Sequence, residues 1–314
     1  MTSEIPTATP NENAGTSAGF VALIGAPNAG KSTLLNQLVG QKVAIVTHKA
    51  QTTRQRIRGI TIEGNSQLVF VDTPGIFKPK RRLDKAMVSA AWGGADEADV
   101  TALIVDATRT RADHEGFVAI LRSLANSKTP CLLVLNKVDE APREKLLELA
   151  AAANEICRFE ETFMISALKG DGVPALRKKL ASMMPEGPFL YPADQVVDLS
   201  QRLLASEITR EKLYLRMHDE LPYATTVETE GWTERKDGSV KIDQVIYVER
   251  ASQKAIVLGR GGQAIKIIGQ SAREEIEEAL GIKAHLFLFV KVREGWGNDP
   301  ERYRMMGLDF PKQG

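Results

Sequence analysis

The sequence predicts an α/β domain, with a mostly parallel sheet and helices on both faces, followed by a smaller α+β domain. Short apolar runs alternate with helical patterns over the first 185 residues or so, and such alternation is typical of a parallel sheet. A stretch with three prolines, PEGPFLYPAD (185–194), then interrupts the pattern. The 314 residues also exceed the usual size of one domain, about 100–200 residues. We therefore expect two domains.

Four segments make up the expected organisation. Residues 1–18 are rich in threonine, serine, asparagine, proline and glycine, which predicts a disordered tail and ordered structure from about Phe20. The first domain is expected at 19–184 and an interdomain linker at 185–198. The second domain and a C-terminal tail fill 199–314.

Five apolar runs predict the strands of the first domain. Their apolar side chains are continuous, as in strands that are buried on both faces. The runs are FVALIG (20–25), LVFVDT (68–73), VTALIVDA (100–107), CLLVLNK (131–137) and TFMISA (162–167). A helix is predicted over 142–156, because Pro142 lies near its start and these apolar residues recur at helical spacing: Leu146, Leu149, Ala153 and Ile156.

The second domain has a different order of elements. The pattern predicts a helix at 199–215, strands at 223–231 and 240–249 with a turn around 236–238, a helix at 262–280 and a strand at 284–293. Helices and strands that do not alternate regularly predict an α+β domain.

Composition sets limits on function. Apolar residues make up 43% and charged residues 26%, as in a globular protein, and no segment approaches 18 consecutive apolar residues. The net charge is +1, and residues 186–314 hold 18 Lys and Arg against 21 Asp and Glu, so any RNA contact needs a local basic surface. We expect Cys131 and Cys157 to be buried thiols and assign no metal to the four histidines.

A phosphate-binding loop is predicted at GAPNAGKS (25–32), which follows a predicted strand and opens a helix. Backbone N–H groups and the positive end of the helix would meet the phosphate oxygens. Lys31 would reach the β- and γ-phosphates, and the Ser32 hydroxyl would bind Mg²⁺. The residues expected around the phosphates are Gly25, Ala26, Pro27, Asn28, Ala29, Gly30, Lys31, Ser32 and Thr33.

Three further motifs select GTP over ATP. In DTPG (72–75), Asp72 ends a strand where it can hold the metal through water, and Gly75 can offer its N–H to the γ-phosphate. In NKVD (136–139), the Asp139 carboxylate accepts from the N1–H and N2–H₂ of guanine, donors that adenine lacks in this arrangement. A backbone N–H of SAL (166–168) can meet guanine O6. The residues expected to contact nucleotide here are Asp72, Thr73, Pro74, Gly75, Asn136, Lys137, Asp139, Ser166, Ala167 and Leu168.

A switch segment is predicted at QTTR (51–54), between the phosphate loop and DTPG. A threonine there can close over Mg²⁺ and the γ-phosphate when GTP is bound, and we choose Thr53 over Thr52. Such a segment would become ordered with GTP and relax after hydrolysis.

These motifs together resemble the translation-factor-related GTPases and, more narrowly, the Era-type GTPases of bacteria. The resemblance covers nearly all of 19–310. It rests also on KAQTTRQRIRGI (49–60), ASEITREKL (205–213), LPY (221–223), VERASQKAIVLGRGGQAIKIIG (248–269) and VKVREGW (290–296). It implies a P-loop GTPase domain followed by a type II KH domain, hydrolysis of GTP to GDP, binding to the 3′ region of 16S rRNA, and assistance in assembly of the 30S subunit.

The KH resemblance gives a candidate RNA site at the GxxG tetrad. Its glycines would let an RNA backbone pass closely before the next helix, and Lys254, Arg260 and Lys266 supply charge. The predicted contacts are Lys254, Gly259, Arg260, Gly261, Gly262 and Lys266. The third position of the tetrad is usually basic in this family, but here it is Gly261. We therefore expect the affinity for RNA to depend more on Lys254 and Lys266. The apolar residues Ile256, Val257, Ile265 and Ile268 line the groove or fill the core.

Two details bear on catalysis. Ile76 stands where Ras-like proteins place the glutamine that orients water, so slow intrinsic hydrolysis is expected. Related GTPases with an asparagine at the position of Asn28 can use bound K⁺, which makes Asn28 a candidate K⁺ ligand.

Two alternative functions are left open: a GTPase acting on tRNA or the large subunit, and a non-catalytic module that binds RNA or membrane. We expect a cytoplasmic monomer and leave peripheral association with the inner membrane open.

Overall fold

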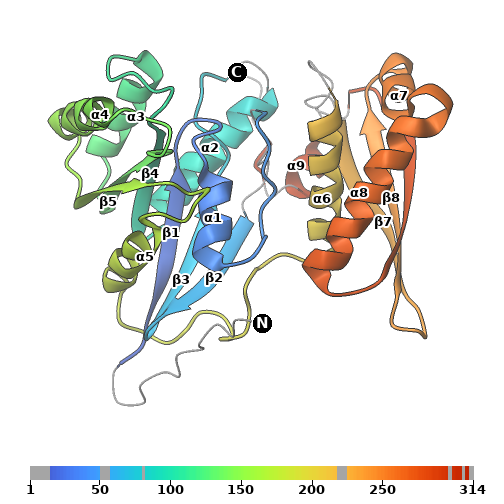
Figure 1. Cartoon of the computed structure of the whole chain (residues 1–314), viewed down its shortest axis with the longest axis horizontal. Coiled ribbons are helices and arrows are strands. Elements are labelled where there is room, and N and C mark those ends of the chain that lie inside the picture. Colours follow the sequence, from blue (N-terminus) through green and yellow to red (C-terminus); the bar gives the residue numbers. More distant parts are fainter. Residues whose placement is uncertain are drawn as a thin grey trace. The chain divides into compact units, whose positions relative to one another are not determined.

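The computed structural model describes residues 15–49, 57–79, 82–217, 225–295, 299–305 and 308–310. These residues fall into two compact units (Figure 1). The first unit contains residues 15–41, 57–76 and 91–198, and the second contains 42–49, 77–79, 82–90 and the described residues from 199 onward. Both units therefore combine segments that are distant in sequence.

The first unit is built on a six-stranded sheet. The spatial order is β2-β3-β1-β4-β5-β6; β2 runs antiparallel to β3, and the other neighbouring pairs are parallel. The mostly parallel sheet predicted from the sequence is thus confirmed. The strands are β1 (Ser17–Ile24), β2 (Ile57–Glu63), β3 (Ser66–Asp72), β4 (Val100–Asp106), β5 (Cys131–Asn136) and β6 (Glu161–Ile165).

Two strands differ from the sequence prediction. β1 begins at Ser17, before the expected start at Phe20, because Ser17 already pairs with Ser66 in the parallel register. β2 was not among the predicted strands. Its sequence, IRGITIE, is interrupted by charge and glycine, and the strand lies at the edge of the sheet, where one side needs no strand partner.

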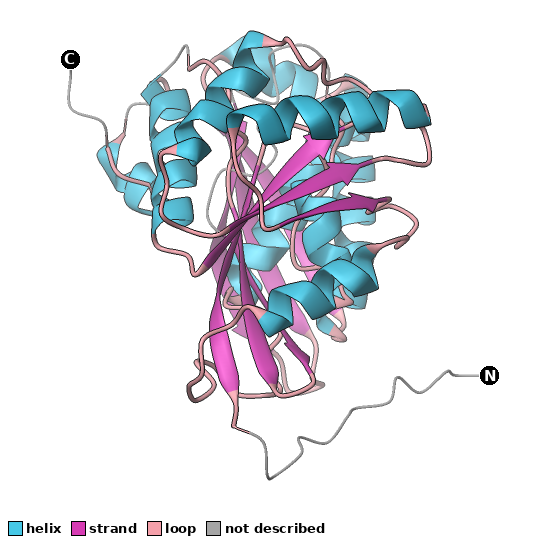
Figure 2. Ribbon diagram, turned by 90° about the vertical axis from the view of Figure 1, so that its left-hand side faces the viewer, coloured by secondary structure: helices cyan, strands magenta, loops and turns pink. Residues whose placement is uncertain are grey.

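Helices cover both faces of this sheet (Figures 1 and 2). α3 and α4 share one apolar core, in which Phe117 and Leu121 of α3 meet Leu146 and Leu149 of α4. α1 buries Leu34, Leu35 and Leu38 and contacts α5. The bounds are α1 (Lys31–Val39), α2 (Arg82–Asp96), α3 (Glu115–Ala125), α4 (Arg143–Ile156) and α5 (Val173–Ser182).

The expected linker, residues 185–198, lies along the first unit. Val196 accepts from the Ile60 N–H at 2.7 Å, and the Asp198 N–H donates to Arg58 at 3.0 Å. The buried Gln67 side chain binds the backbone of Leu190 and Tyr191. The segment thus covers part of the exposed edge of β2, which would otherwise present unpaired backbone groups.

The second unit has a three-stranded sheet with the order β7-β8-β9. β7 is antiparallel to β8, and β8 is parallel to β9, so the expected α+β architecture is confirmed. α7 was not among the predicted helices. The elements are α6 (Gln201–Arg216), β7 (Thr225–Glu234), β8 (Val240–Val248), α7 (Ala251–Leu258), the short 3₁₀ turn Arg260–Gly262, α8 (Gln263–Leu280), β9 (Ala284–Val292) and α9 (Pro300–Met305).

Two segments from the first half of the sequence complete the second unit. Lys42 forms ion pairs with Glu211 of α6 and with Glu275 of α8, and the Val46 N–H donates to Glu211 at 2.8 Å. The N-terminal half of α2 packs Met87 against Tyr303 and Leu308. None of the helices in the described part of the chain is long and apolar enough to cross a membrane.

Candidate functional site

The phosphate loop connects β1 to α1. Two of its positions need glycine, because atoms of β4 and β5 come very close to the loop backbone there. Gly25 has φ 147°, and a Cβ there would lie 2.2 Å from the carbonyl oxygen of Ile104. Gly30 has φ 96°, and a Cβ would lie 2.2 Å from Nδ2 of Asn136. Both values are far below van der Waals contact, so only glycine fits. The loop is therefore held against the ends of β4 and β5.

Lys31 begins α1 and is buried. Its Nζ donates to the carbonyl oxygens of Gly25 at 3.2 Å and Ala26 at 3.0 Å, so the ammonium lies inside the loop. Burial lowers the pKa of Lys31 to about 8, and the nearby Asp72 carboxylate offsets only part of this effect. A phosphate group at this loop would favour the charged lysine.

The DTPG motif packs directly on the phosphate loop. Asp72 ends β3 and is buried, and its Oδ2 accepts from the Ser32 hydroxyl at 2.7 Å. The Ile76 N–H donates to the Gly25 carbonyl oxygen at 2.9 Å. A Cβ on Gly75 would lie 2.8 Å from the backbone nitrogen of Pro27. Ser32 and Asp72 are therefore in contact, and the end of the DTPG motif packs on the phosphate loop at Gly25 and Pro27.

The oxygen donors at this point fit Mg²⁺. Mg²⁺ prefers hard oxygen ligands and usually takes one or two protein ligands together with water and substrate phosphates. A serine hydroxyl and a carboxylate 2.7 Å apart match that preference. Thr73 supports the geometry, because its hydroxyl donates to the Leu23 carbonyl oxygen at 2.8 Å and fixes the end of β3 beside β1.

Asn136 joins the phosphate loop to the SAL loop. Its Nδ2 donates to the Ala29 carbonyl oxygen at 2.8 Å, and its Oδ1 accepts from the Ala167 N–H at 2.9 Å. Both bonds are buried. They connect Asn136 to residues that are 107 and 31 positions away in the sequence. A guanine O6 atom at the Ala167 N–H would share that donor with Asn136.

Lys137 has an acidic partner that the sequence analysis missed. Lys137 adopts φ 65°, and its Nζ lies 2.6 Å from Oδ2 of Asp106 at the end of β4. Burial alone would raise the pKa of Asp106, but hydrogen bonds from Lys137 and Thr108 hold it below its ordinary value. The signal was present in the sequence, since an acid that ends a strand next to the NKVD strand would lie at the same sheet edge.

Asp139 is held ionised at the base-recognition end of the site. A hydrogen bond from Ser166 lowers the pKa of Asp139, and Lys169, with its Nζ 3.2 Å from Oδ2, acts in the same direction. An ionised carboxylate is the acceptor that the two guanine donors require. Leu168 of the same loop is 73% exposed, so it is available to a bound base.

The predicted switch segment cannot be placed. Thr53, Thr52 and the rest of QTTR lie outside the described residues. Ile76, at the position of the Ras-like glutamine, is 9% exposed and belongs to the core formed with α3 and α4. An isoleucine side chain has no polar group, so Ile76 cannot orient a water molecule by a hydrogen bond.

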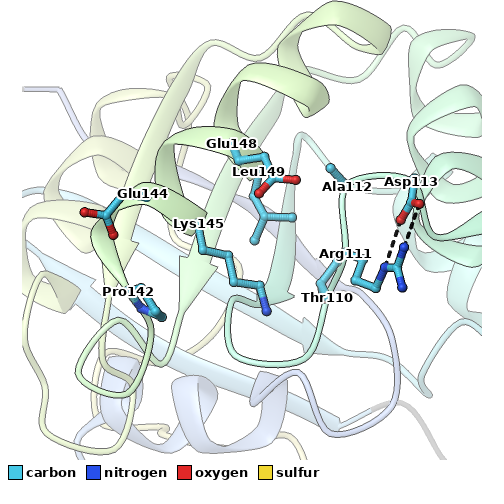
Figure 3. Close-up of a pocket in the computed structure, with 9 residues that line it drawn as sticks. All are labelled: Thr110, Arg111, Ala112, Asp113, Pro142, Glu144, Lys145, Glu148 and Leu149. Carbon is cyan, nitrogen blue, oxygen red and sulfur yellow. Dashed lines mark hydrogen bonds and ion pairs between the residues drawn. The ribbon is translucent and has the colours of Figure 1, made fainter.

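A pocket of about 520 Å³ lies beside this site (Figure 3). Its walls come from the loop after β4 and from the start of α4, and they contain none of the predicted nucleotide contacts. Lys145 connects the two walls, because its Nζ donates to the Thr108 carbonyl oxygen at 2.6 Å. This bond ties the start of α4 to the loop that follows Asp106, the partner of Lys137.

The GxxG tetrad forms the turn between α7 and α8. Gly259 has φ 72°, and a Cβ there would lie 2.6 Å from the Cβ of Ala264. Gly261 and Gly262 have φ 58° and 77°, and a Cβ on either would meet no atom within 4 Å. The outer half of the turn is thus open, with Arg260 exposed beside it. Such a surface admits a nucleic-acid backbone.

The structure separates core from surface around this turn. Val257 and Ile268 are buried in the core of the second unit, and Ile265 packs against it. Ile256 is 57% exposed. Of the four apolar residues proposed for the groove, only Ile256 presents most of its side chain to solvent.

Comparisons with known proteins agree with this architecture. A family model described as "50S ribosome-binding GTPase" matches residues 20–137, and a "KH domain" model matches 220–297. The chain is 64% identical to "GTPase Era" of Brucella suis biovar 1 (strain 1330) over 296 residues, 94% of each chain. It is also 64% identical to "GTPase Era" of Rhizobium meliloti (strain 1021) over 298 residues, 95% of this chain and 94% of the relative.

Two solved structures match over 93% of this chain and 99% of their own. One is "Era in complex with MgGDPNP and nucleotides 1506-1542 of 16S ribosomal RNA", with 37% identity and a TM-score of 0.87. The other is a single-residue variant of Era from Aquifex aeolicus, bound to GDP.AlF4-, with 38% identity and a TM-score of 0.85.

Proposed function

The chain belongs to the Era family of GTPases, and from this premise we propose that it is a GTP-controlled switch that binds the 3′ region of 16S rRNA and assists assembly of the 30S subunit. As a member of that family it binds guanine nucleotide and hydrolyses GTP to GDP and phosphate. One observation carries the proposal: Asn136 holds the phosphate loop and the SAL loop together, in a chain that also contains an open GxxG turn.

We assign the residue roles from the sequence motifs, and the geometry of the described residues supports them. Lys31 neutralises the β- and γ-phosphates, and the Gly75 N–H reaches the γ-phosphate. Ser32 and Asp72 would hold Mg²⁺, Asp72 through water, and the ion would supply positive charge that neutralises the phosphates. Asp139 reads N1–H and N2–H₂ of guanine, and Ala167 reads O6. Thr53 completes the site in the GTP state.

Hydrolysis depends on positioning and electrostatics in this scheme. The buried Ile76 cannot orient the attacking water, so the rate without a partner is slow. Asn28 adopts φ 63° within the phosphate loop, a conformation that asparagine tolerates better than most residues. Its amide oxygen is a suitable ligand for K⁺, which would add positive charge near the β- and γ-phosphates. Equal GTPase rates in K⁺ and Na⁺ buffers would exclude this role.

The RNA half of the proposal is tested at Gly261. Gly261→Asp places a negative charge on the open turn without a steric clash, because a Cβ at this position meets nothing within 4 Å. Gly261→Asn is the matched control, since asparagine has the same shape, is neutral and also tolerates positive φ. The measurement is the affinity for nucleotides 1506–1542 of 16S rRNA, the segment bound in the solved Era complex.

We expect the full-length chain to prefer this RNA over an oligonucleotide of the same composition in scrambled order. Gly261→Asp should weaken binding at least tenfold because of repulsion from the phosphates, whereas Gly261→Asn should bind within a factor of about 3, since it adds no charge. Equal affinity of the wild-type chain for both oligonucleotides would contradict the proposal.

A further inference from the structure

Asp106 ends β4 directly opposite Asn136, the last residue of β5. Its side chain is 8% exposed, and its two carboxylate oxygens have separate partners. Oδ2 lies 2.6 Å from Nζ of Lys137, the residue that follows Asn136. Oδ1 accepts from the hydroxyl and the backbone N–H of Thr108, at 2.5 and 2.9 Å. The carboxylate is therefore oriented by contacts on both of its oxygens.

The loop that follows Asp106 is held in place by two further bonds. The Ala107 N–H donates to the carbonyl oxygen of Asn136 at 3.0 Å, which extends the pairing of β4 with β5 by one residue. The Thr108 carbonyl oxygen accepts from Nζ of Lys145 at 2.6 Å, and this bond connects the loop to α4. Asp106 thus presents Oδ2 to Lys137 from a fixed position.

Lys137 gains a defined direction from this carboxylate. A lysine side chain is among the most flexible, so fixing it costs rotamer entropy. The backbone of Lys137 is also unusual, with φ 65°. The other charged residue of NKVD, Asp139, has different partners, namely Ser166 and Lys169. The ammonium of Lys137 and the carboxylate that reads guanine are therefore held by separate contacts.

We propose that Asp106 is a positioning residue for guanine-nucleotide binding, because it holds the Lys137 side chain in the direction in which that side chain covers the base. This inference rests on the proposed function, in which Lys137 contacts the nucleotide. Asp106 itself touches no atom of the nucleotide in this scheme. A side chain that is already ordered loses less freedom when the ligand binds, so the affinity rises without a new contact. The apolar stem of a lysine can cover a ring while its ammonium stays with a carboxylate.

The experiment measures the affinity of the full-length chain for GDP by calorimetry. Asp106→Asn keeps the shape and an acceptor for Thr108 but removes the charge that faces Lys137. Asp106→Ser is a second variant without the charge, and its hydroxyl can still accept from a nearby backbone N–H. Lys137→Met removes the ammonium from the other side of the pair, alone and together with Asp106→Asn. Asp113→Asn is the matched control, since it makes the same change at an exposed acid further along the same loop.

We expect Asp106→Asn and Asp106→Ser each to raise the dissociation constant for GDP about five- to tenfold, as for one flexible side chain that must become ordered on binding. Asp113→Asn should leave it unchanged. In the Lys137→Met background, Asp106→Asn should have no further effect, because the ammonium that it holds is gone. The KM for GTP should rise while kcat stays unchanged, since Lys137 is not assigned to the γ-phosphate. Thermal melting verifies that each variant folds.

Two results would overturn the inference while leaving Lys137 as a nucleotide contact. One is wild-type affinity for GDP in both Asp106 variants. The other is an equal loss of affinity when Asp106→Asn is added to the wild-type chain and to Lys137→Met, because Asp106 would then act through its loop and not through Lys137. If Lys137→Met binds GDP as the wild-type chain does, the role of Lys137 in the proposed function fails, and the inference fails with it.

Discussion

At the residue scale, Lys31 combines burial with a requirement for positive charge. Burial lowers its pKa from 10.5 to about 8, so the folded chain releases this proton at lower pH than the unfolded chain. The free energy of unfolding of the nucleotide-free chain should therefore rise with pH between about 8 and 10.5. Below pH 8 the charged lysine destabilises the fold, and bound phosphates remove this penalty.

This predicts that nucleotide binding takes up a proton. Phosphates favour the charged form of Lys31, so uptake should be small at pH 7 and should approach one proton per GDP above the lowered pKa of about 8. Calorimetry in two buffers with different heats of ionisation measures it. Lys169→Ala, which removes a lysine that is 58% exposed in the same site, should retain the uptake. Identical binding heats in both buffers at every pH would contradict the prediction.

Asp139 sets the choice of base in this account. In Asp139→Asn an amide donor replaces one carboxylate oxygen and would face a guanine donor, so affinity for GTP should fall about 100-fold or more. Xanthine has an oxygen where guanine has its amino group, and the variant should therefore bind xanthosine triphosphate better than GTP. Competition binding measures both. Asp113→Asn, at an exposed acid that pairs with Arg111, should behave as wild type.

At the element scale, the sequence predicted those elements whose pattern is local. The strands of the parallel sheet were predictable because they are continuous apolar runs that are buried on both faces. β2 was not, because it lies at an edge. The path of residues 190–198 along β2, and the pairing of Lys42 with Glu211, depend on contacts between residues more than 120 positions apart. No local pattern encodes such pairings.

The same reasoning applies to the candidate site. The four motifs predict nucleotide contacts because each places a particular residue type at the end of a strand. Asp106 was missed because it belongs to no motif, although its place in β4 puts it opposite Asn136 in the register. The bonds from Asn136 to two loops likewise follow from the fold and not from the spacing of residues.

The segment along β2 should contribute measurably to stability. Gln67 is fully buried, and its amide makes three hydrogen bonds to Leu190 and Tyr191, between 2.8 and 3.0 Å. Gln67→Ala removes all three hydrogen bonds and leaves a gap at a buried position, so it should lower the free energy of unfolding by about 2–4 kcal/mol. Urea unfolding measures this change. Gln270→Ala, at an exposed position of α8, should cost less than about 0.5 kcal/mol, and an equal loss in both variants would count against the prediction.

Lysines on the two helices that flank the GxxG turn should contribute to RNA binding through their positive charge. Lys254→Gln and Lys266→Gln should each weaken RNA binding regardless of sequence and reduce the slope of log affinity against log salt by about 0.7–0.9, the value for one phosphate contact. Lys236→Gln, in the turn between β7 and β8, is the control with unchanged slope. Affinities measured over a range of salt concentrations decide this, and unchanged slopes in the first two variants would exclude these lysines as phosphate contacts.

At the scale of the whole molecule, each compact unit holds one of the two predicted sites. The first holds the phosphate loop, DTPG, NKVD and SAL around one sheet edge. The second holds the GxxG turn, and it also takes in residues 42–49, which precede the predicted switch segment, and residues 82–90.

The central claim is tested most directly by GTP turnover of the full-length chain with and without nucleotides 1506–1542 of 16S rRNA. The account predicts slow multiple-turnover hydrolysis by the chain alone and acceleration by this RNA, with no acceleration in the Gly261→Asp variant. Equal turnover in the presence and absence of the RNA, under conditions in which the RNA is bound, would contradict it.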